Sequence, residues 1–174
     1  TIEITPPMAC SDCNQTIGIN NPDEITCAMP EVELLVTASE TATYQWTGPN
    51  GFSSTSDQIN VSLPGSYEVV VSFSDGCLQV DSIEVIANDD IPFVLLGPDQ
   101  VLNCQIKQVT LDASNSIYTT GAQFAWSDES GNIISTNLVT TVDQGGKYFF
   151  VIVDPITGCR SDVGEVEVIV DNNE

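Results

Sequence analysis

Hydrophobic and polar side chains alternate along most of this chain with a period of two, the pattern of β-strands that bury one face. In the segment 32–38, for example, Val32, Leu34, Val36 and Ala38 fall on one face. Similar runs recur roughly every 8 to 12 residues, separated by Gly, Pro and Asn, a spacing typical of β-sandwiches. No segment keeps the apolar period of an α-helix, so the pattern predicts an all-β protein.

One strand-turn-strand segment occurs twice, in residues 65–77 and 146–159. Each copy starts with Gly-x-Tyr, continues through β-branched and aromatic residues, and ends with Gly-Cys. An Asp and a second alternating run follow in both cases. The pattern predicts two equivalent β-hairpins, each a strand, a tight turn and a returning strand.

The repetition extends upstream of the hairpins. A Pro-Asp pair precedes a cysteine in both copies, and an aromatic-x-Trp sequence follows. The offset between copies is 76 residues at Pro22 and Pro98 and 82 at Cys77 and Cys159, a drift that length changes in surface turns would produce. The repeating unit is therefore a whole domain of about 80 residues.

The repeat divides the chain into two tandem β-sandwich domains, spanning 14–87 and 93–174. The acidic, proline-ended segment 88–92 is a short linker, so we expect the two domains to be arranged end to end. Residues 1–13 are interpreted as the end of a preceding repeat plus a Cys-x-x-Cys loop, because Ile2-Glu3-Ile4 echoes the last strands of both repeats. The chain would then be an interior segment of a longer protein.

Trp46 and Trp126 occupy the same place in the two units. An exposed tryptophan could stack on a sugar ring, but recurrence in the same register favours a central core aromatic in each unit.

The repeated strand of the second unit is apolar on both faces. Phe149, Val151 and Val153 alternate with Tyr148, Phe150 and Ile152. Either another segment covers the outer face of this strand, or that face is a contact surface.

The chain is strongly acidic, with 25 Asp and Glu against 3 Lys and Arg and a formal net charge of -22. Nucleic acid is excluded as a partner, because its binding depends on neutralising phosphates with Lys and Arg. An anionic bilayer is disfavoured for the same reason, and no apolar run approaches the roughly 20 residues of a membrane helix. Cation binding or salt tolerance would use such acids, but a solvated, self-repelling surface is the simpler interpretation.

Six cysteines are available to stabilise two small domains. Because they recur at matched places, we predict disulfides from Cys27 to Cys77 and from Cys104 to Cys159. Each would close a loop of about 50 residues, which the chain-entropy model values at about 4 kcal/mol. Paired cysteines favour an oxidising, extracellular or cell-surface location over a cytosolic one with buried free thiols.

Cys10 and Cys13 form a Cys-x-x-Cys sequence that has no counterpart in the second unit. A redox motif would open a helix, which nothing here predicts, and a zinc site would need two further ligands in a chain without histidine. A local disulfide between the two is the favoured interpretation, and pairing outside this chain is the alternative.

The chain resembles the tandem PKD-like and immunoglobulin-like repeats of secreted Bacteroidetes surface proteins and adhesins. The resemblance rests on Trp46, Gly65-x-Tyr67, Gly76-Cys77 and Asp81, on the matching residues of the second unit, and covers nearly everything from Pro22 to Val170. The Gly-Asp-Gly loop of the PKD pattern is not kept after Trp46, which favours the looser immunoglobulin-like assignment. The resemblance implies two tandem immunoglobulin-like (PKD-like) β-sandwiches that act as spacers, stalks or adhesive modules.

The acidic linker resembles the interdomain linkers of cadherins, which bind calcium. Asp89 and Asp90 are therefore candidate calcium ligands, since hard cations prefer six or more oxygen ligands. The companion acidic motifs of that pattern are missing, and a solvated acidic hinge is the simpler interpretation. No other cofactor is predicted.

Enzymatic function is not predicted, and no catalytic residue is assigned. Without histidine neither a Ser-His-Asp nor a Cys-His arrangement can form, and no pair of acids is singled out by the repeat as a glycosidase would require. We expect a non-catalytic structural or adhesive segment of a large repeat protein, a spacer, stalk or fibre unit, with neighbouring repeats, other copies or a surface glycan as partners. A carbohydrate-binding module of a secreted hydrolase, using an exposed aromatic such as Phe52, is the alternative.

Overall fold

The computed structural model describes residues 13–171, which divide into two compact units. Unit 1 contains the described residues up to Ile25 and from Met29 to Asn88. Unit 2 contains residues 89–171 and also the short segment Thr26–Ala28. The prediction that residues 1–12 end a preceding repeat falls outside the described residues.

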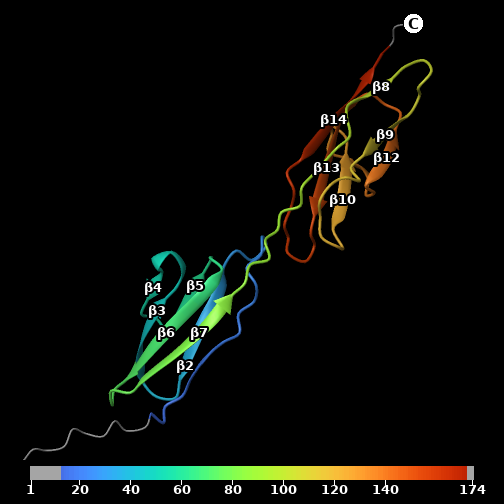
Figure 1. Cartoon of the computed structure of the whole chain (residues 1–174). Coiled ribbons are helices and arrows are strands. Elements are labelled where there is room, and N and C mark those ends of the chain that lie inside the picture. The colour runs from blue at the N-terminus through green and yellow to red at the C-terminus, as the bar shows by residue number, and fades with distance from the viewer. Residues whose placement is uncertain (1–12, 172–174) are drawn as a thin grey trace, which may run out of the picture. The chain divides into compact units, whose positions relative to one another are not determined.

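Unit 1 is built from two antiparallel sheets (Figure 1). Its strands are β1 (Ile17–Ile19), β2 (Val32–Ala38), β3 (Ala42–Thr47), β4 (Ser53–Ser54), β5 (Gln58–Val61), β6 (Gly65–Phe73) and β7 (Leu78–Val85). One sheet has the order β1-β2-β5 and the other the order β4-β3-β6-β7. A single parallel bridge between Ile25 and Ala87 lies beyond the end of β7. A 3-10 turn (Pro49–Gly51) joins β3 to β4.

The core of unit 1 consists of the inward side chains of the two sheets, as the alternation predicted. On β2, Val32, Leu34 and Val36 are buried while Glu33 and Thr37 are exposed. Trp46 is fully buried at the centre, and its Nε1 donates a hydrogen bond to the Ser56 carbonyl oxygen at 3.0 Å. Its buried polar atom is therefore satisfied, as burial of an indole requires.

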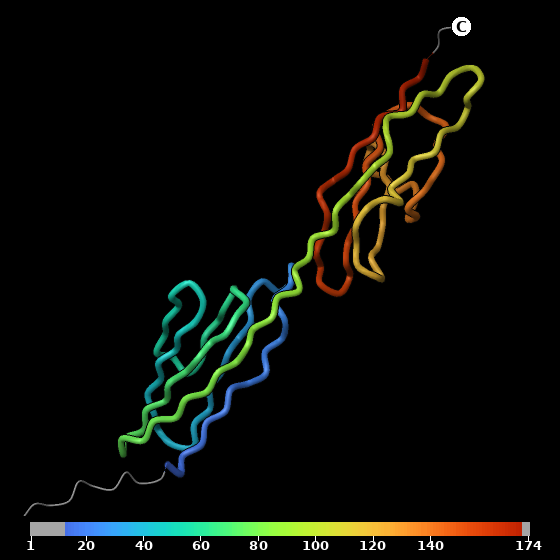
Figure 2. Tube along the Cα trace, in the orientation of Figure 1, coloured from blue at the N-terminus to red at the C-terminus, as the bar shows by residue number. Residues whose placement is uncertain are grey.

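Unit 2 repeats the plan with one sheet enlarged. Its strands are β8 (Gln100–Leu102), β9 (Val109–Asp112), β10 (Gln123–Ser127), β11 (Ile133–Ser135), β12 (Val139–Val142), β13 (Gly146–Val153) and β14 (Gly164–Val170). The large sheet has the order β11-β10-β13-β14-β8, and β9 pairs with β12 in the smaller one. Strand β8 runs parallel to β14, while the other named pairs are antiparallel. Figure 2 shows β13 and β14 joined by a turn, as the repeated hairpin predicted.

The core of unit 2 is organised around Trp126 and Phe150, both fully buried. Their ring centroids lie 4.6 Å apart, and Phe150 also stacks on Phe124 at 6.1 Å. Side chains of both sheets complete the core, among them Leu111, Ile152 and Val168. The recurrence of tryptophan in the two units therefore marks the core, which confirms that prediction over sugar stacking for Trp46 and Trp126.

A buried tyrosine anchors the start of the repeated hairpin in each unit. The Tyr67 hydroxyl donates a hydrogen bond to the Leu63 carbonyl oxygen, and Tyr148 donates one to the Gln144 carbonyl oxygen, both at 2.9 Å. This is the tyrosine corner of immunoglobulin-like sandwiches. Together with the buried tryptophan on β3 and β10 and the order of the strands, it assigns both units to the immunoglobulin-like fold in tandem.

Candidate interaction surface

The cysteines do not pair as the repeat predicted. Cys13 is bonded to Cys77 and Cys27 is bonded to Cys159, while Cys104 is an exposed free thiol. The predicted pairs Cys27 with Cys77 and Cys104 with Cys159 are therefore wrong. So is the local disulfide between Cys10 and Cys13, because Cys13 is bonded to Cys77; Cys10 itself lies outside the described residues.

The reason for the error is that Cys27 does not pack with the repeat to which it belongs in sequence. The segment Thr26–Ala28 clusters with unit 2, where the Ala28 amide donates a hydrogen bond to the Thr157 carbonyl oxygen at 2.9 Å. Thr157 lies in the β13-β14 turn, which also carries Cys159. The matched spacing therefore identified the equivalent cysteines correctly. The error was the assumption that each disulfide forms between two cysteines of the same repeat.

The β13-β14 turn is held by the buried Asp154. Its carboxylate accepts hydrogen bonds from the Thr119 hydroxyl at 2.5 Å, the Ile156 amide at 2.8 Å and the Thr157 amide at 3.3 Å. These donors favour the charged form, with Thr119 the strongest contributor, so the pKa of Asp154 lies below its usual value. The turn that presents Cys159 is thus ordered by one side chain.

Asp89 and Asp90, the candidate calcium ligands, are both exposed. Within residues 13–171, no group of three or more His, Cys, Asp or Glu side chains is arranged to hold a metal ion. Calcium binding at this pair therefore stays a prediction from the sequence. No helix in the same range is long and apolar enough to cross a membrane.

Phe52 does not present the exposed aromatic ring that the carbohydrate-binding alternative requires. It is half-buried, and its ring packs edge-on against Tyr67 with the centroids 5.5 Å apart. Phe52 is thus a packing residue at the margin of the unit 1 core.

The strongest candidate for a functional surface is the outer face of β10, β11 and β13 in unit 2. On β13, Tyr148, Phe150 and Ile152 are buried, so Phe149, Val151 and Val153 point to the opposite side of the sheet, where they are half-buried. This confirms that β13 is apolar on both faces. We call the outward set Ala125, Ile133, Phe149, Val151 and Val153 the apolar face.

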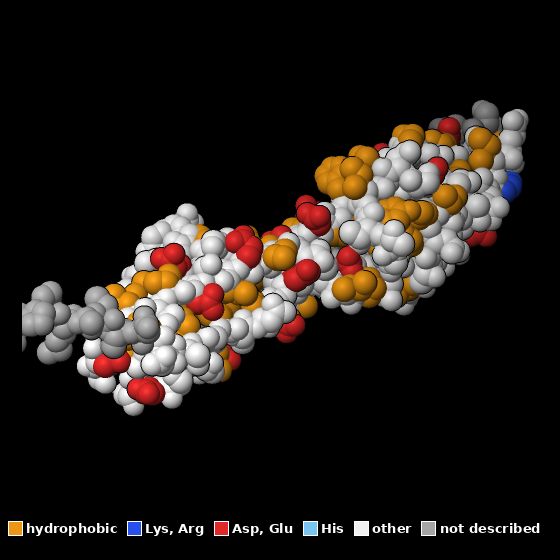
Figure 3. Space-filling view, turned by 60° about the horizontal axis from the view of Figure 1, so that its bottom comes forward, with side chains coloured by type: hydrophobic (Ala, Val, Ile, Leu, Met, Phe, Trp, Pro, Cys, Tyr) orange, Lys and Arg blue, Asp and Glu red, His pale blue; other side chains and the backbone are white. Residues whose placement is uncertain are grey.

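Strand pairing brings these side chains together. Ala125 lies opposite Val151 and Gln123 opposite Val153, and Ile133 of the edge strand pairs with Ser127. A groove of about 600 Å³ runs over this part of the sheet. Its lining residues are Ala122, Gln123, Phe124, Ala125, Ile133, Thr136, Val151 and Val153. Hydrophobic side chains form several groups on the surface of unit 2 in Figure 3, whereas acidic side chains are spread over both units.

The β10-β11 turn sets the position of Ile133. The Asp128 carboxylate accepts hydrogen bonds from the Ser130 and Asn132 amides, both at 2.9 Å, and from the Asn132 side chain at 3.0 Å. These bonds, those from Asn132 first, lower the pKa of Asp128. The turn returns the chain to β10 with a register shift between Trp126 and Ser127, after which Ile133 is 66% exposed at the edge of the sheet.

Charged residues border the apolar face on the β14 side. Glu165 pairs opposite Phe149, and its carboxylate lies 2.6 Å from Lys147 Nζ. The hydrogen bond from Lys147 to Glu165 raises the pKa of the lysine. The Glu165 carboxylate balances the positive charge of Lys147. The Glu129 carboxylate, which accepts a hydrogen bond from the Lys147 amide, adds a second negative charge, so this border is acidic overall.

Unit 1 provides an internal comparison for the apolar face. Its strands β3 and β6 pair in the same register as β10 and β13, with Trp46 opposite Val69 where unit 2 has Trp126 opposite Phe150. The corresponding outward pairs are Thr43 with Ser72, Gln45 with Val70 and Thr47 with Glu68 in unit 1, and Gln123 with Val153, Ala125 with Val151 and Ser127 with Phe149 in unit 2. Unit 1 is therefore polar at all but Val70, which shows that the fold does not require an apolar surface here.

No family model matches the chain, and no curated protein matches its sequence. Among solved structures, Drosophila OTK extracellular domains 3-5 match at 12% identity with a TM-score of 0.49, over 90% of this chain and 62% of that one. This chain therefore spans less than two thirds of the OTK structure. Domains IG1 and IG2 of DIP-gamma match at 10% identity and a TM-score of 0.49, over 92% and 99% of the two chains. Sidekick-1 immunoglobulin domains 1-4 match at 10% identity with a TM-score of 0.38, over 88% of this chain and 46% of that one.

Proposed function

We propose that this chain is a non-catalytic adhesive segment of a secreted or cell-surface repeat protein, in which unit 2 contacts another protein through the apolar face. The observation that supports this best is the contrast between the two units. The same sheet positions carry Glu68, Ser72 and Gln45 in unit 1 but Phe149, Val153 and Ala125 in unit 2. A side-chain pattern that the fold does not need is best explained by a contact that it serves.

Charge indicates the kind of protein that would bind there. The chain carries a formal net charge of -22, and Glu165 and Glu129 lie at the border of the apolar face. A second copy would bring the same excess of negative charge and would be repelled. We therefore assign the apolar face to a different protein, whose contact surface is apolar at its centre and carries Lys or Arg at its rim.

The extended role follows the resemblance to tandem PKD-like and immunoglobulin-like repeats of secreted Bacteroidetes surface proteins. In this proposal, the units also serve as spacers or stalk segments outside the cell. Their two disulfides fit an oxidising, extracytoplasmic compartment.

A synthetic peptide of alternating Leu and Lys tests the apolar face, because in extended form it presents one apolar side flanked by positive charge. A peptide of alternating Ser and Lys has the same charge without the apolar side chains. We expect the full chain to bind the Leu-Lys peptide more tightly, measured by calorimetry at several salt concentrations. The difference between the two peptides isolates the apolar contribution from the nonspecific attraction of an acidic protein.

Matched substitutions locate the binding. Val153→Lys places a charge on the apolar face and should remove most of the preference for the Leu-Lys peptide, a loss on the order of tenfold for about 1.4 kcal/mol. Ser72→Lys adds the same charge at the equivalent position of unit 1 and should retain the preference. Equal binding of both peptides by the unmodified chain, or equal loss in both variants, would overturn the proposal.

A further inference from the structure

Cys27 and Cys104 occupy the same position in the two repeats, although one is disulfide-bonded and the other is free. Each lies two residues after the residue that bridges to the end of its repeat, Ile25 to Ala87 just beyond β7 and Leu102 to Val170 within β14. The hydrogen bonds agree: the Asn88 amide donates to the Ile25 carbonyl oxygen at 2.8 Å, and the Asp171 amide donates to the Leu102 carbonyl oxygen at 2.9 Å.

The hairpin-turn cysteines are equivalent in the same way. The Cys77 carbonyl oxygen accepts a hydrogen bond from the Phe73 amide at 2.9 Å, and the Cys159 carbonyl oxygen accepts one from the Asp154 amide at 2.8 Å. Both close the turn of the repeated hairpin. In each unit the hairpin-turn cysteine is bonded to a cysteine that lies upstream in the chain, Cys13 for Cys77 and Cys27 for Cys159.

We propose that Cys104 forms a disulfide with the hairpin-turn cysteine of a third immunoglobulin-like unit that follows unit 2. This inference rests on the proposed role as part of a repeat array. The observation that carries it is the pairing of the equivalent Cys27 with Cys159, which belongs to the repeat that follows its own in the chain. If Cys104 pairs as Cys27 does, its partner is the hairpin-turn cysteine of the repeat that follows unit 2.

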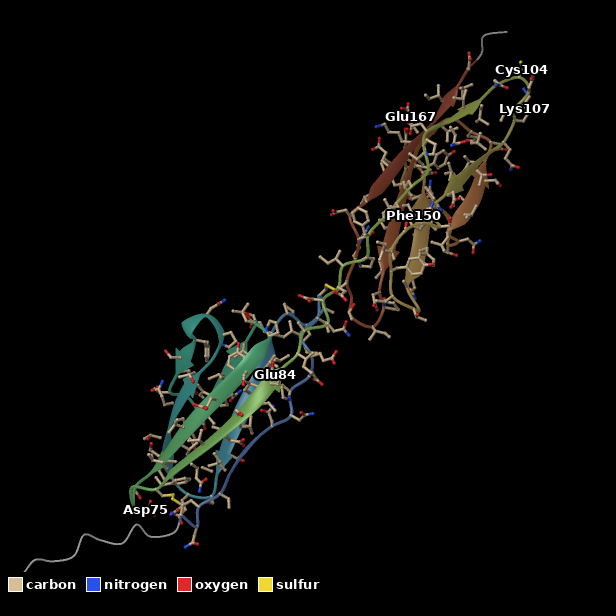
Figure 4. The ribbon with its side chains drawn as sticks, viewed as in Figure 1. Asp75, Glu84, Cys104, Lys107, Phe150 and Glu167 are labelled. Atoms are coloured by element: carbon tan, nitrogen blue, oxygen red, sulfur yellow. A yellow bond between two sulfur atoms is a disulfide. The ribbon has the colours of Figure 1, made fainter. Side chains whose placement is uncertain are left out.

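The location of Cys104 suits this role. It lies at one end of unit 2 in Figure 4. There it lines a hollow of about 270 Å³ together with Val170 and Asp171. The Cys104 thiol therefore lies beside the end of β14, the last strand of unit 2.

The loop that carries Cys104 is already ordered. The Asn103 side-chain oxygen accepts hydrogen bonds from the Gln105 amide at 2.9 Å and the Ile106 amide at 2.7 Å. The Asn103 amide in turn donates to the Ile106 carbonyl oxygen at 2.9 Å. A tight turn thus holds the exposed thiol, and little chain entropy remains to be lost when the disulfide forms.

The oxidant for this bond is a small-molecule disulfide such as oxidised glutathione. The Cys104 thiolate attacks one sulfur of this reagent, forming a mixed disulfide and releasing one glutathione thiolate. The thiolate of the partner cysteine then attacks the Cys104 sulfur and releases the second glutathione. Two protein thiols lose two protons and two electrons, and one disulfide reagent is reduced to two thiols.

The test appends a second copy of residues 89–174 to the C-terminus of the full chain, so that a hairpin turn with its own Cys159 follows unit 2. In the appended copy, Cys104→Ser removes the second free thiol, and Ile156→Val at an 81% exposed position gives the appended Cys159 peptide its own mass. The protein is refolded in a glutathione buffer and digested without reduction, and its disulfides are mapped by mass spectrometry. We expect Cys104 bonded to Cys159 of the appended copy, with Cys27 still bonded to the original Cys159. When the original Cys104 is also replaced by Ser, the appended Cys159 should be labelled by iodoacetamide.

Two controls separate this result from misfolding and from the adhesive proposal. The Cys27–Cys159 disulfide in the same digest reports correct folding, and binding of the Leu-Lys peptide reports the apolar face independently. Cys104 that stays fully alkylated while Cys27–Cys159 forms would overturn the inference. So would a disulfide from Cys104 to Cys10, within one chain or between two copies.

Discussion

Cys27 and Cys159 are separated by 132 positions in the chain, yet their Cα atoms lie 4.9 Å apart and their sulfurs are bonded. The disulfide joins the segment Thr26–Ala28 to the hairpin turn of unit 2. It therefore gives the chain a second covalent connection between the two halves of the sequence, in addition to the peptide backbone at residues 88–92.

A cut in the linker should leave the two halves joined. We expect a chain with a protease site inserted between Asp90 and Ile91, both exposed, to run as one band after cleavage on a non-reducing gel and as two bands after reduction. The pairing predicted from the repeat, Cys27 with Cys77 and Cys104 with Cys159, would release the halves without reductant. In the double variant Cys27→Ser, Cys159→Ser the halves should separate under both conditions.

Loss of the tyrosine-corner hydroxyl should destabilise unit 2 moderately. Burial raises the pKa of Tyr148, so its hydroxyl stays protonated and donates to the Gln144 carbonyl oxygen at 2.9 Å. We expect Tyr148→Phe to lower the free energy of unfolding by about 1 kcal/mol, measured by urea denaturation. Tyr44→Phe is the control, since its hydroxyl makes no hydrogen bond to the described residues, and a loss as large as that of Tyr148→Phe would contradict this explanation.

Acid should weaken the hairpin turn of unit 2 through Asp154. Because hydrogen bonds from Thr119, Ile156 and Thr157 lower its pKa in the folded state, Asp154 contributes stability above its unfolded pKa of about 3.9. That contribution is lost as the pH falls through the lowered folded value. We expect Asp154→Asn to reduce the melting temperature at pH 7, and the gap to the unmodified chain to close below about pH 4.

The exposed Glu40 provides the matched control for this pH dependence. Glu40→Gln removes one carboxylate from unit 1 without touching the hairpin turn. A gap for Asp154→Asn that stays constant from pH 7 to pH 3 would show that its carboxylate contributes through packing and not through its charge.

The sequence was sufficient for those features that depend on local period and recurrence. Alternation on the segment 32–38 identified β2 and its buried face, and recurrence of Trp46 as Trp126 identified the two core centres. The two apolar faces of β13 could also be recognised from the sequence, because consecutive residues of this strand are apolar. In a two-layer unit only one of these faces packs in the core, so the other needs a partner. These statements need no knowledge of which segments meet in space.

The disulfides and the edge of the apolar face required that knowledge. Spacing showed that Cys27 is equivalent to Cys104, but the hydrogen bond from Ala28 to Thr157 decides that this segment joins unit 2. Likewise, Ile133 reaches the apolar face only because the pairing of β10 with β11 shifts register after Trp126. A register shift is a property of two paired strands and leaves no periodic signal in either strand.

The last prediction concerns tension applied to the two ends of the chain. The shortest covalent path between the ends passes through the Cys27–Cys159 disulfide, so it leaves out residues 28–158. Those residues carry no load through their backbone while the bond is intact. At about 3.6 Å per extended residue, roughly 470 Å of chain is thereby withheld from stretching.

Single-molecule force spectroscopy measures this length directly. With the chain pulled from its ends, we expect the gain in contour length on unfolding to be larger by about 470 Å in the presence of a reductant than in its absence. Without reductant, the Cys27→Ser variant should gain only about half of this length, because the Cys13–Cys77 disulfide still withholds residues 14–76. Cys104→Ser should behave as the unmodified chain because Cys104 is a free thiol. Full extension of the unmodified chain under oxidising conditions would show that Cys27 and Cys159 are not bonded. In that case the backbone of residues 28–158, and hence the strands of both units, would carry the load.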